Sequence, residues 1–286
     1  MKYSSNRSFR QALEDRLKTN YPHYQIPRLR KMITFERFMA RLDDHWILKG
    51  GYALQLRTDS ARTTQDIDLL ALNIPPDQIQ ESLFEIIHRD LGDFFDFVVE
   101  RSSQSFISGS VIRFKVTAKL AGRNFEQFHI DIGFGDPIVE LVEYLEPPQY
   151  LDFAEIPITR IPCYPATQHI AEKVHALTRP RMTENSRVKD LVDILLFACM
   201  DIHLGAGALF NAIQAVFMAR GDVIPSQLKP FPSDWKSKYS QFTKNTAIPF
   251  SHYDDAVQAA HLFIDPVLSG KNHGTWDSIN WKWEDD

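Results

Sequence analysis

Apolar positions in the first half of the chain follow two different spacings. Spacings of three and four residues predict helices over residues 8–19 and 27–42 and from Pro75 to Leu91. Short apolar runs and strict alternation predict strands over residues 45–48, 66–70, 95–100, 111–118 and 125–132. Gly50-Gly51 ends the first of these strands, and a short helix is expected over residues 52–56. We therefore expect a β-rich half with flanking helices.

The second half of the chain has a helical pattern. A Pro-rich connector over residues 147–165 precedes it, and Pro165 suits the first turn of a helix. Helical spacing predicts helices over residues 166–179, 186–200, 206–219, 233–243 and 252–268. The chain ends in a Trp-rich segment, whose tryptophans we interpret as packing anchors because acidic residues surround them. We expect two domains, residues 1–157 and residues 158–286.

The composition is that of an ordinary globular protein. Apolar residues make up 44% of the 286 positions and charged residues 24%, which argues against extensive disorder. Two cysteines in apolar neighbourhoods exclude a disulfide framework and a Cys-based metal site. No stretch approaches the roughly 18 uninterrupted apolar residues of a membrane span, and residues 1–10 lack the apolar segment of a signal peptide. These features predict a cytoplasmic protein without a membrane partner.

Charge is unevenly distributed along the chain. The 37 acidic residues outnumber the 32 basic ones, so the net charge of −5 does not indicate nucleic-acid binding. The first 41 residues are nevertheless locally basic. They contain Lys2, Arg7, Arg10, Arg16, Lys18, Arg28, Arg30, Lys31, Arg37 and Arg41. We expect any RNA surface to lie on these helices and near Lys173 and Lys189.

Paired carboxylates and a glycine pair predict a site for metal ions and phosphate. Asp66 and Asp68 lie two residues apart in a predicted strand, so they share one face and can hold one or two Mg²⁺ ions. Gly50 and Gly51 lie between a strand and a helix, where a backbone without Cβ atoms can approach a polyphosphate. Asp131 points away from its apolar neighbours and would be a third carboxylate. Together these residues predict metal-assisted phosphoryl or nucleotidyl transfer.

Each fragment of this pattern also has a simpler interpretation. A Gly-Gly pair is usually a turn, and an Asp-x-Asp sequence is usually a solvated end of a strand. We favour the metal site because apolar residues flank both acids and because unpaired carboxylates are costly to bury.

Further candidate residues lie outside these segments. Arg62, in the loop before the paired acids, could clamp phosphate, although a loop arginine is more often merely solvated. Helical spacing places Lys189, Asp190 and Asp193 on one polar stripe, which is either part of a nucleotide site or a solvated, salt-bridged face. Lys173 lies at the border of its helix's apolar face, as an ordinary surface lysine would.

Four motifs follow one another over about residues 35–200. They are KGGYALQLR with ARTTQDIDL at residues 49–57 and 61–69, IDIGFGDP at 130–137, AEKVHALTRPR at 171–181 and NSRVKDLVDI at 185–194. This ordered set resembles the AbiEii/AbiGii toxin-like family of nucleotidyltransferases, which belongs to the polymerase-beta-like superfamily. The rest of the chain resembles the family only loosely.

The resemblance implies an α+β fold, with a mixed-sheet nucleotidyltransferase core, flanking helices and a helical carboxy-terminal domain that completes the nucleotide site. It implies a Mg²⁺-dependent toxin of a toxin–antitoxin pair that uses a nucleoside triphosphate (NTP). Some members of the family modify tRNA 3′ ends, which would make RNA the acceptor and an antitoxin protein a partner.

The resemblance also implies roles for individual residues. The metal ligands would be Asp66, Asp68 and Asp131. The catalytic residues would be Asp66, Asp68, Asp131, Lys173 and Asp193. With the positions identified above, the nucleotide-binding residues would be Gly50, Gly51, Arg62, Lys173, Lys189, Asp190 and Asp193. The chain departs from the family at Tyr52, where related enzymes often offer a small hydroxyl group to phosphate, and in the long spacing between Gly51 and Asp66.

Two other functions remain open from the sequence. The same chemistry could act on a small hydroxylated molecule, as in antibiotic-modifying nucleotidyltransferases, and the net charge of −5 favours this acceptor. Alternatively, the chain could be a non-catalytic nucleotide-binding module that retains the fold.

Overall fold

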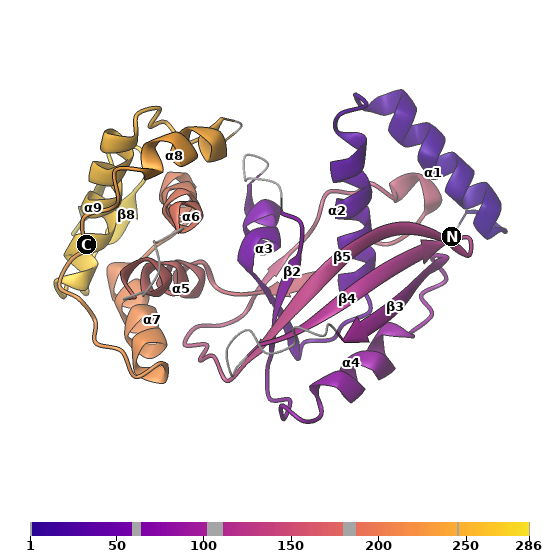
Figure 1. Cartoon of the computed structure of the whole chain (residues 1–286), viewed down its shortest axis with the longest axis horizontal. Helices are drawn as coiled ribbons and strands as arrows, with labels where there is room; N and C mark the ends of the chain where they lie inside the picture. The colour runs from indigo at the N-terminus through magenta and orange to yellow at the C-terminus, as the bar shows by residue number, and fades with distance from the viewer. Residues whose placement is uncertain (1, 59–63, 102–110, 180–186, 245, 286) are drawn as a thin grey trace. The chain divides into compact units, whose positions relative to one another are not determined.

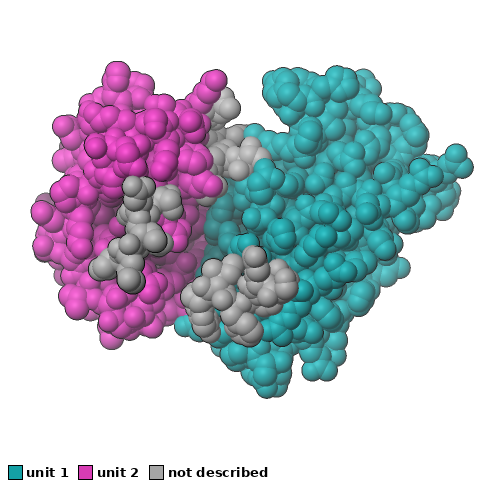
Figure 2. Space-filling view, viewed as in Figure 1, with its two compact units in different colours: residues 1–56, 63–135, 144–163 teal, residues 57–62, 136–143, 164–286 magenta. Residues whose placement is uncertain are grey.

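The computed structural model describes residues 2–58, 64–101, 111–179, 187–244 and 246–285. Arg62, one of the predicted nucleotide-binding residues, lies outside them. Figure 2 colours two compact units, which we call unit 1 and unit 2. Unit 1 comprises residues 1–56, 63–135 and 144–163, and unit 2 comprises residues 57–62, 136–143 and 164–286. The division into domains at residue 157 stays a prediction.

In the described part of the chain, a seven-stranded mixed sheet has the order β3-β4-β5-β2-β1-β7-β6 (Figure 1). Its strands are β1 (Trp46–Lys49), β2 (Ile67–Ala71), β3 (Phe95–Arg101), β4 (Val111–Leu120), β5 (Arg123–Phe134), β6 (Glu143–Leu145) and β7 (Ile161–Cys163). β2 is parallel to β5 and β1 is parallel to β7, whereas the β1–β2, β3–β4 and β4–β5 pairs are antiparallel. This mixed sheet with its helices confirms the α+β fold class.

Helices cover one face of the sheet in unit 1. They are α1 (Asn6–Asn20), α2 (Ile26–Met39) and α4 (Ile79–Ile87), and Figure 1 shows α2 crossing β5 and β4. Phe35 and Phe38 of α2 pack edge-on against Phe128 of β5, with ring centroids 4.9 and 5.6 Å apart. Phe84 of α4 contacts Phe114 of β4 at 6.3 Å. These aromatic contacts belong to the apolar core of unit 1.

The opposite face of β4 and β5 is polar. Along β4, the even-numbered side chains from Ile112 to Leu120 are buried, whereas the odd-numbered ones are partly or fully exposed. β5 alternates in the same way around Phe128, Ile130 and Ile132. Successive side chains of a strand point to opposite faces of the sheet. Asp131 therefore points away from the apolar core, as its sequence pattern predicted.

Two basic residues near the amino terminus lie in the core. The side chains of Arg37 and Arg41 are 3% and 1% exposed. Arg37 Nε donates to Asp93 at 2.8 Å, and Arg41 donates to both oxygens of Asp93 at 3.0 and 2.8 Å. Burial raises the pKa of the neighbouring Glu36 to about 7, against the opposing charge of Arg37. For Arg37 and Arg41, the predicted RNA surface is therefore wrong, because buried acids already neutralise them.

Unit 2 is mainly helical. It contains α5 (Ala166–Thr178), α6 (Val188–Cys199), α7 (Ala206–Ala219), α8 (Trp235–Thr243) and α9 (Tyr253–Leu268), followed by the hairpin of β8 (Thr275–Asp277) and β9 (Lys282–Glu284). The indole N–H groups of Trp276, Trp281 and Trp283 donate to backbone carbonyls of α6 and α9 at 2.9, 3.0 and 2.9 Å. These hydrogen bonds attach the carboxy-terminal segment to α6 and α9, which confirms that the tryptophans are packing anchors.

Several elements differ from the pattern-based expectation. β6, β7 and the β8–β9 hairpin were not predicted, because strands of three residues are too short for alternation to show. α4 is shorter than predicted, since residues 75–78 form a turn before it. The helix after β1, α3 (Gly50–Arg57), begins at Gly50 without a loop. No helix among the described residues is long and apolar enough to cross a membrane.

Candidate functional site

Four charged residues form a row across the polar face of the sheet in unit 1. In the strand register, Lys49 of β1 lies opposite Asp68 of β2, and Asp68 lies opposite Asp131 of β5. Asp131 in turn lies opposite Arg113 of β4. Residues directly opposite each other on neighbouring strands project to the same face. The structure therefore brings together two of the predicted carboxylates, Asp68 and Asp131, and flanks them with two cations.

Gly50 lies directly against the carboxylate of Asp68. Its φ of +68° is a conformation that favours glycine, and a Cβ atom at this position would overlap Asp68 Oδ2. Gly51 is buried in the first turn of α3. The predicted glycine pair thus allows the backbone to approach a carboxylate closely. Tyr52, the departure from the family, is fully buried with its ring 5.1 Å from Phe35, so its hydroxyl does not face the polar surface.

Asp66 lies one residue before β2, beside His129 of β5. The backbone N–H of His129 donates to Asp66 Oδ1 at 3.4 Å, and the imidazole Nδ1 lies 3.7 Å from the same oxygen. The Asp66 side chain is 42% exposed and that of His129 is 46% exposed. Because Asp66 neighbours His129 and Asp68 neighbours Asp131, the four side chains stand as two adjacent pairs at one place on the sheet.

Arg113 holds Asp131 through two parallel hydrogen bonds. Its Nε and Nη2 donate to the two carboxylate oxygens at 2.6 and 2.5 Å. The hydrogen bond with Asp131, and then its negative charge, raise the pKa of the Arg113 guanidinium above its usual range. A bidentate arginine fixes the plane of a carboxylate as well as neutralising it. Arg113 therefore sets the orientation of Asp131.

The donor atoms at this site fit a hard divalent cation. Asp66 and Asp68 offer carboxylate oxygens on a polar, partly exposed face, and Mg²⁺ prefers such oxygens. In the described ranges, no three His, Cys, Asp or Glu side chains stand close enough together to form a metal-binding group. Both oxygens of Asp131 are engaged by Arg113. The roles of Asp66, Asp68 and Asp131 as metal ligands stay a prediction.

A buried ion cluster in unit 2 contains three more of the predicted residues. Lys173 Nζ donates to Asp190 Oδ1 at 2.9 Å and to Asp193 Oδ2 at 2.7 Å. The side chains of Lys173, Asp190 and Asp193 are 13%, 6% and 1% exposed. Burial alone would lower the pKa of Lys173, but the two carboxylates outweigh it and raise the pKa above its usual range. Arg187 adds a second cation, 3.3 Å from Asp190.

Lys189 does not join this cluster. It is exposed, and its Nζ lies 5.2 Å from the centre of the Phe242 ring. The prediction of one polar stripe is wrong here, because Asp190 and Asp193 are buried with Lys173 while Lys189 faces solvent. Consecutive helix residues point in directions about 100° apart, so neighbours in sequence need not share a surface.

The sequence did not single out three further basic residues that bond to residues of the motifs. Alternation placed Arg113 and His129 on the polar side of their strands, but only the register pairs them with Asp131 and Asp66. Arg220 donates to Asp136 at 3.1 Å and to Glu172 at 3.4 Å, and these acids belong to two of the motifs that carry the family resemblance. No local sequence signal connects residues this far apart.

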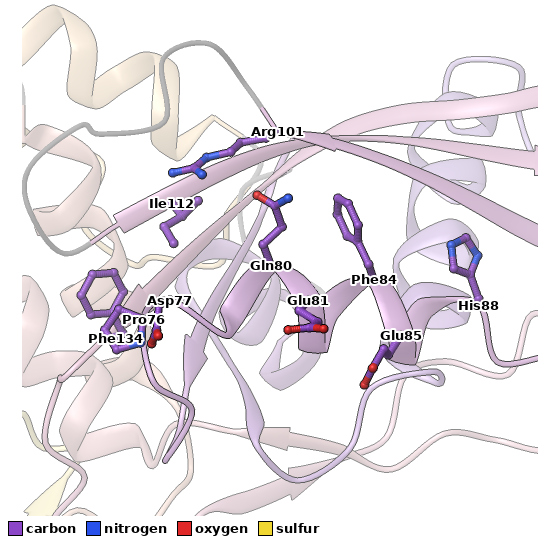
Figure 3. Close-up of a pocket in the computed structure, with 10 residues that line it drawn as sticks. All are labelled: Pro76, Asp77, Gln80, Glu81, Phe84, Glu85, His88, Arg101, Ile112 and Phe134. Carbon is purple, nitrogen blue, oxygen red and sulfur yellow. The ribbon is translucent and has the colours of Figure 1, made fainter.

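The pocket in Figure 3 lies on the other face of the sheet. It has a volume of about 890 Å³ and is lined by α4, by Arg101 and Ile112, and by Phe134 at the end of β5. Figure 3 shows Gln80 and Phe84 pointing from α4 towards the strands. Ile112 shares the face of Ile132, which is opposite to that of Asp131. The pocket contains none of the predicted site residues.

Comparison with known proteins gives one match to a family. The family described as nucleotidyl transferase AbiEii toxin of type IV toxin–antitoxin systems matches residues 37–259. No curated protein matches the chain. Among solved structures, the chain is similar to JHP933 from Helicobacter pylori, at 13% identity and a TM-score of 0.45 over 88% of this chain and 95% of that chain. A candidate nucleotidyltransferase from H. pylori gives 12% identity and a TM-score of 0.44, over 88% and 97% of the two chains.

Proposed function

Because the chain belongs to the AbiEii family of nucleotidyl transferase toxins of type IV toxin–antitoxin systems, we propose that it transfers a nucleoside monophosphate from an NTP to an RNA hydroxyl in the presence of Mg²⁺. A tRNA 3′ end is the acceptor we favour. The observation that carries the proposal is the row of Lys49, Asp68, Asp131 and Arg113 on the polar face of the sheet. It gathers carboxylates and cations at one accessible place, as the transfer of a charged phosphoryl group requires.

In this proposal Asp66 and Asp68 hold Mg²⁺, with Asp131 as the third acid. When bound, the metal would activate the acceptor hydroxyl and neutralise the departing pyrophosphate. Gly50 and Arg113 position the carboxylates. Gly50 leaves room for the Asp68 carboxylate, and Arg113 orients Asp131 beside it. Both carboxylates are therefore positioned before any substrate arrives, and such preorganisation lowers the cost of reaching the transition state.

The nucleotide-binding residues follow from the resemblance and from unit 2. We propose Gly50, Gly51, Arg62, Lys173, Lys189, Asp190 and Asp193. The Lys173–Asp190–Asp193 cluster supports a site near α5 and α6, because two buried carboxylates hold an ammonium group there in one position. The family adds an antitoxin as the partner, and we propose that the enzyme acts in the cytoplasm.

The test of the reaction is incubation with each labelled NTP, Mg²⁺ and total tRNA. Wild type should transfer label to RNA, and Asp68→Ala should transfer none. Asp77→Ala, which removes an exposed acid of the same unit, is the matched control and should transfer label like wild type. The absence of label from RNA with all four NTPs would contradict the proposed acceptor.

A small hydroxylated acceptor is the second candidate. The net charge of −5 and the burial of Arg37 and Arg41 favour it, because both features weaken the electrostatic case for RNA. A parallel reaction with small hydroxylated molecules such as aminoglycosides separates the two candidates. Label on the small molecule with none on RNA would support this second function.

A further inference from the structure

Three cations in the basic helices before residue 42 are already engaged inside the protein, so they are poorly suited to hold RNA. Arg37 and Arg41 are buried with Asp93. Arg30 forms an ion pair with Glu14 at 3.2 Å and donates to the backbone carbonyl of Phe125 at 2.8 Å. A cation that is already neutralised inside the protein releases no counterions from RNA phosphates, and this release is the main source of affinity for a polyanion.

A second set of cations lies on the polar face of β4. Arg113, Lys115 and Lys119 occupy odd-numbered positions of this strand. Arg113 is already paired with Asp131, so we call the two lysines the β4 track. Their positions lie about 13 Å apart along the strand, so the track presents two charges along a line. Lys115 is exposed, and Lys119 is partly exposed. Neither lysine forms an ion pair with any residue of the described ranges.

The β4 track leads to the carboxylates. Arg113, at the end nearest the start of β4, is the residue in register with Asp131, and Asp131 is in register with Asp68. A chain of phosphates lying along the track would therefore bring its end to Asp68 and Asp131. The neighbouring positions of β5 on the same face are also polar, and Gln127 there donates to Thr117 of β4 at 3.2 Å.

The composition of this face indicates which part of a nucleic acid it fits. On this face, the open positions of β4 and β5 are Val111, Arg113, Lys115, Thr117, Lys119, Asn124, Gln127, His129 and Asp131. These positions include no Phe, Tyr or Trp, the side chains on which unpaired bases stack. Asp96 and Glu100 of β3 lie opposite Lys119 and Lys115, so the positive charge is confined to a narrow line. Such a line fits a phosphate backbone better than exposed bases.

We propose that the β4 track binds the backbone phosphates of the RNA acceptor and guides its end to Asp68 and Asp131. This inference rests on the proposed function and adds where the acceptor lies. It also predicts that binding tolerates different RNA sequences, because phosphate contacts carry no sequence information.

The experiment measures RNA binding without NTP, so that binding is separated from transfer. Lys115→Gln/Lys119→Gln removes two charges from the β4 track. The matched control, Arg7→Gln/Lys18→Gln, removes two exposed charges from α1 in the same unit. The affinity for fluorescently labelled tRNA is measured by anisotropy at several salt concentrations, and thermal unfolding checks that both variants are folded.

We expect the track variant to lose affinity on the order of tenfold, and its plot of log K against log salt concentration to become shallower by about 1.4 for two lost phosphate contacts. The control should match wild type in both. Equal loss of tRNA affinity in the two variants, or loss only in the control, would overturn the proposal that the β4 track binds RNA.

Labelling of RNA separates failure of this inference from failure of the proposed function. If wild type labels tRNA while the track variant binds tRNA normally, the reaction stands and the β4 track is wrong. If wild type neither binds nor labels RNA but labels a small acceptor, the RNA acceptor is wrong and the track is wrong with it.

Discussion

The carboxylates of the two units have opposite environments. On the sheet face of unit 1, the side chains of Asp66 and Asp131 are 42% and 19% exposed. In unit 2, the side chains of Asp190 and Asp193 are 6% and 1% exposed and both accept from Lys173. A carboxylate near water can exchange its partners for a metal or a substrate, whereas a buried carboxylate needs a fixed cation.

The comparison separates two roles for residues of one chemical type. The sheet carboxylates are accessible from solvent, and the buried carboxylates hold the ammonium group of Lys173 in place. The Arg37–Asp93–Arg41 cluster in the core of unit 1 resembles the second type, since the buried carboxylate of Asp93 accepts hydrogen bonds from both arginines. Substitutions of the sheet carboxylates should therefore lower the transfer rate with little effect on stability, whereas substitutions in the buried clusters should lower the folding stability in addition to any effect on nucleotide binding.

The largest effect is expected at Asp68. Asp68→Asn keeps the size of the side chain but removes its charge, so the rate of label transfer should fall on the order of 10³-fold, about 4 kcal/mol. The melting temperature should change little, because Asp68 is partly exposed. Rate and melting temperature are measured on the same preparation. Wild-type transfer by this variant would remove Asp68 from the catalytic residues.

Substitutions in the buried Lys173–Asp190–Asp193 cluster should lower the stability of the protein. Lys173→Met leaves Asp190 and Asp193 without their main cation, so the free energy of unfolding in urea should fall by about 3–5 kcal/mol. Lys189→Met is the control and should change it by less than about 0.5 kcal/mol, because Lys189 is exposed. Adding Asp190→Asn and Asp193→Asn to Lys173→Met should recover part of the loss. Equal effects of the two single substitutions would contradict the cluster.

Glu36 predicts how stability depends on pH. Burial raises its pKa from 4.5 to about 7 in the folded chain, so between these pH values the folded state binds more protons than the unfolded state. The contribution of Glu36 to the free energy of unfolding is therefore fully present below pH 4.5. It decreases as the pH rises towards 7, by at most about 3 kcal/mol.

Glu36→Gln should remove this part of the pH dependence and make the protein more stable than wild type at pH 8. Urea unfolding at a series of pH values measures both curves. An unchanged slope between pH 4.5 and 7 in the variant would show that Glu36 is not the group responsible.

The smallest effect in this series tests the space beside Asp68. Gly50 and Gly122 have φ of +68° and +69°, but only Gly50 would place a Cβ atom against a carboxylate. Both Ala substitutions should cost about 1 kcal/mol of stability from backbone strain. Gly50→Ala alone should also slow transfer by roughly tenfold, about 1.4 kcal/mol, by displacing Asp68. Equal transfer rates in the two variants would contradict the close approach.

The helices and longer strands were predictable because the spacing of apolar residues within each element is visible in the local sequence. Spacing of three to four residues located α5, α6, α7 and α9, and alternation located β4 and β5. The same alternation predicted that Asp131 faces away from the core, which the structure confirms. The Asp-x-Asp pair and the glycine pair were visible as candidates because each depends on residues close in sequence.

The partners of these residues could not be predicted, because they depend on register and packing between distant segments. No residue near Arg37 in the sequence indicates that its side chain will be buried and will donate to Asp93, 56 residues away. Lys173 and Asp193 likewise meet only because α5 packs against α6. Local spacing by itself determined the elements, the polar face of the sheet and the chemical types of the candidate residues. The tertiary structure decided which carboxylates face solvent and which are buried and paired with a cation. Burial and pairing depend on contacts between distant segments, which the linear order of residues does not contain.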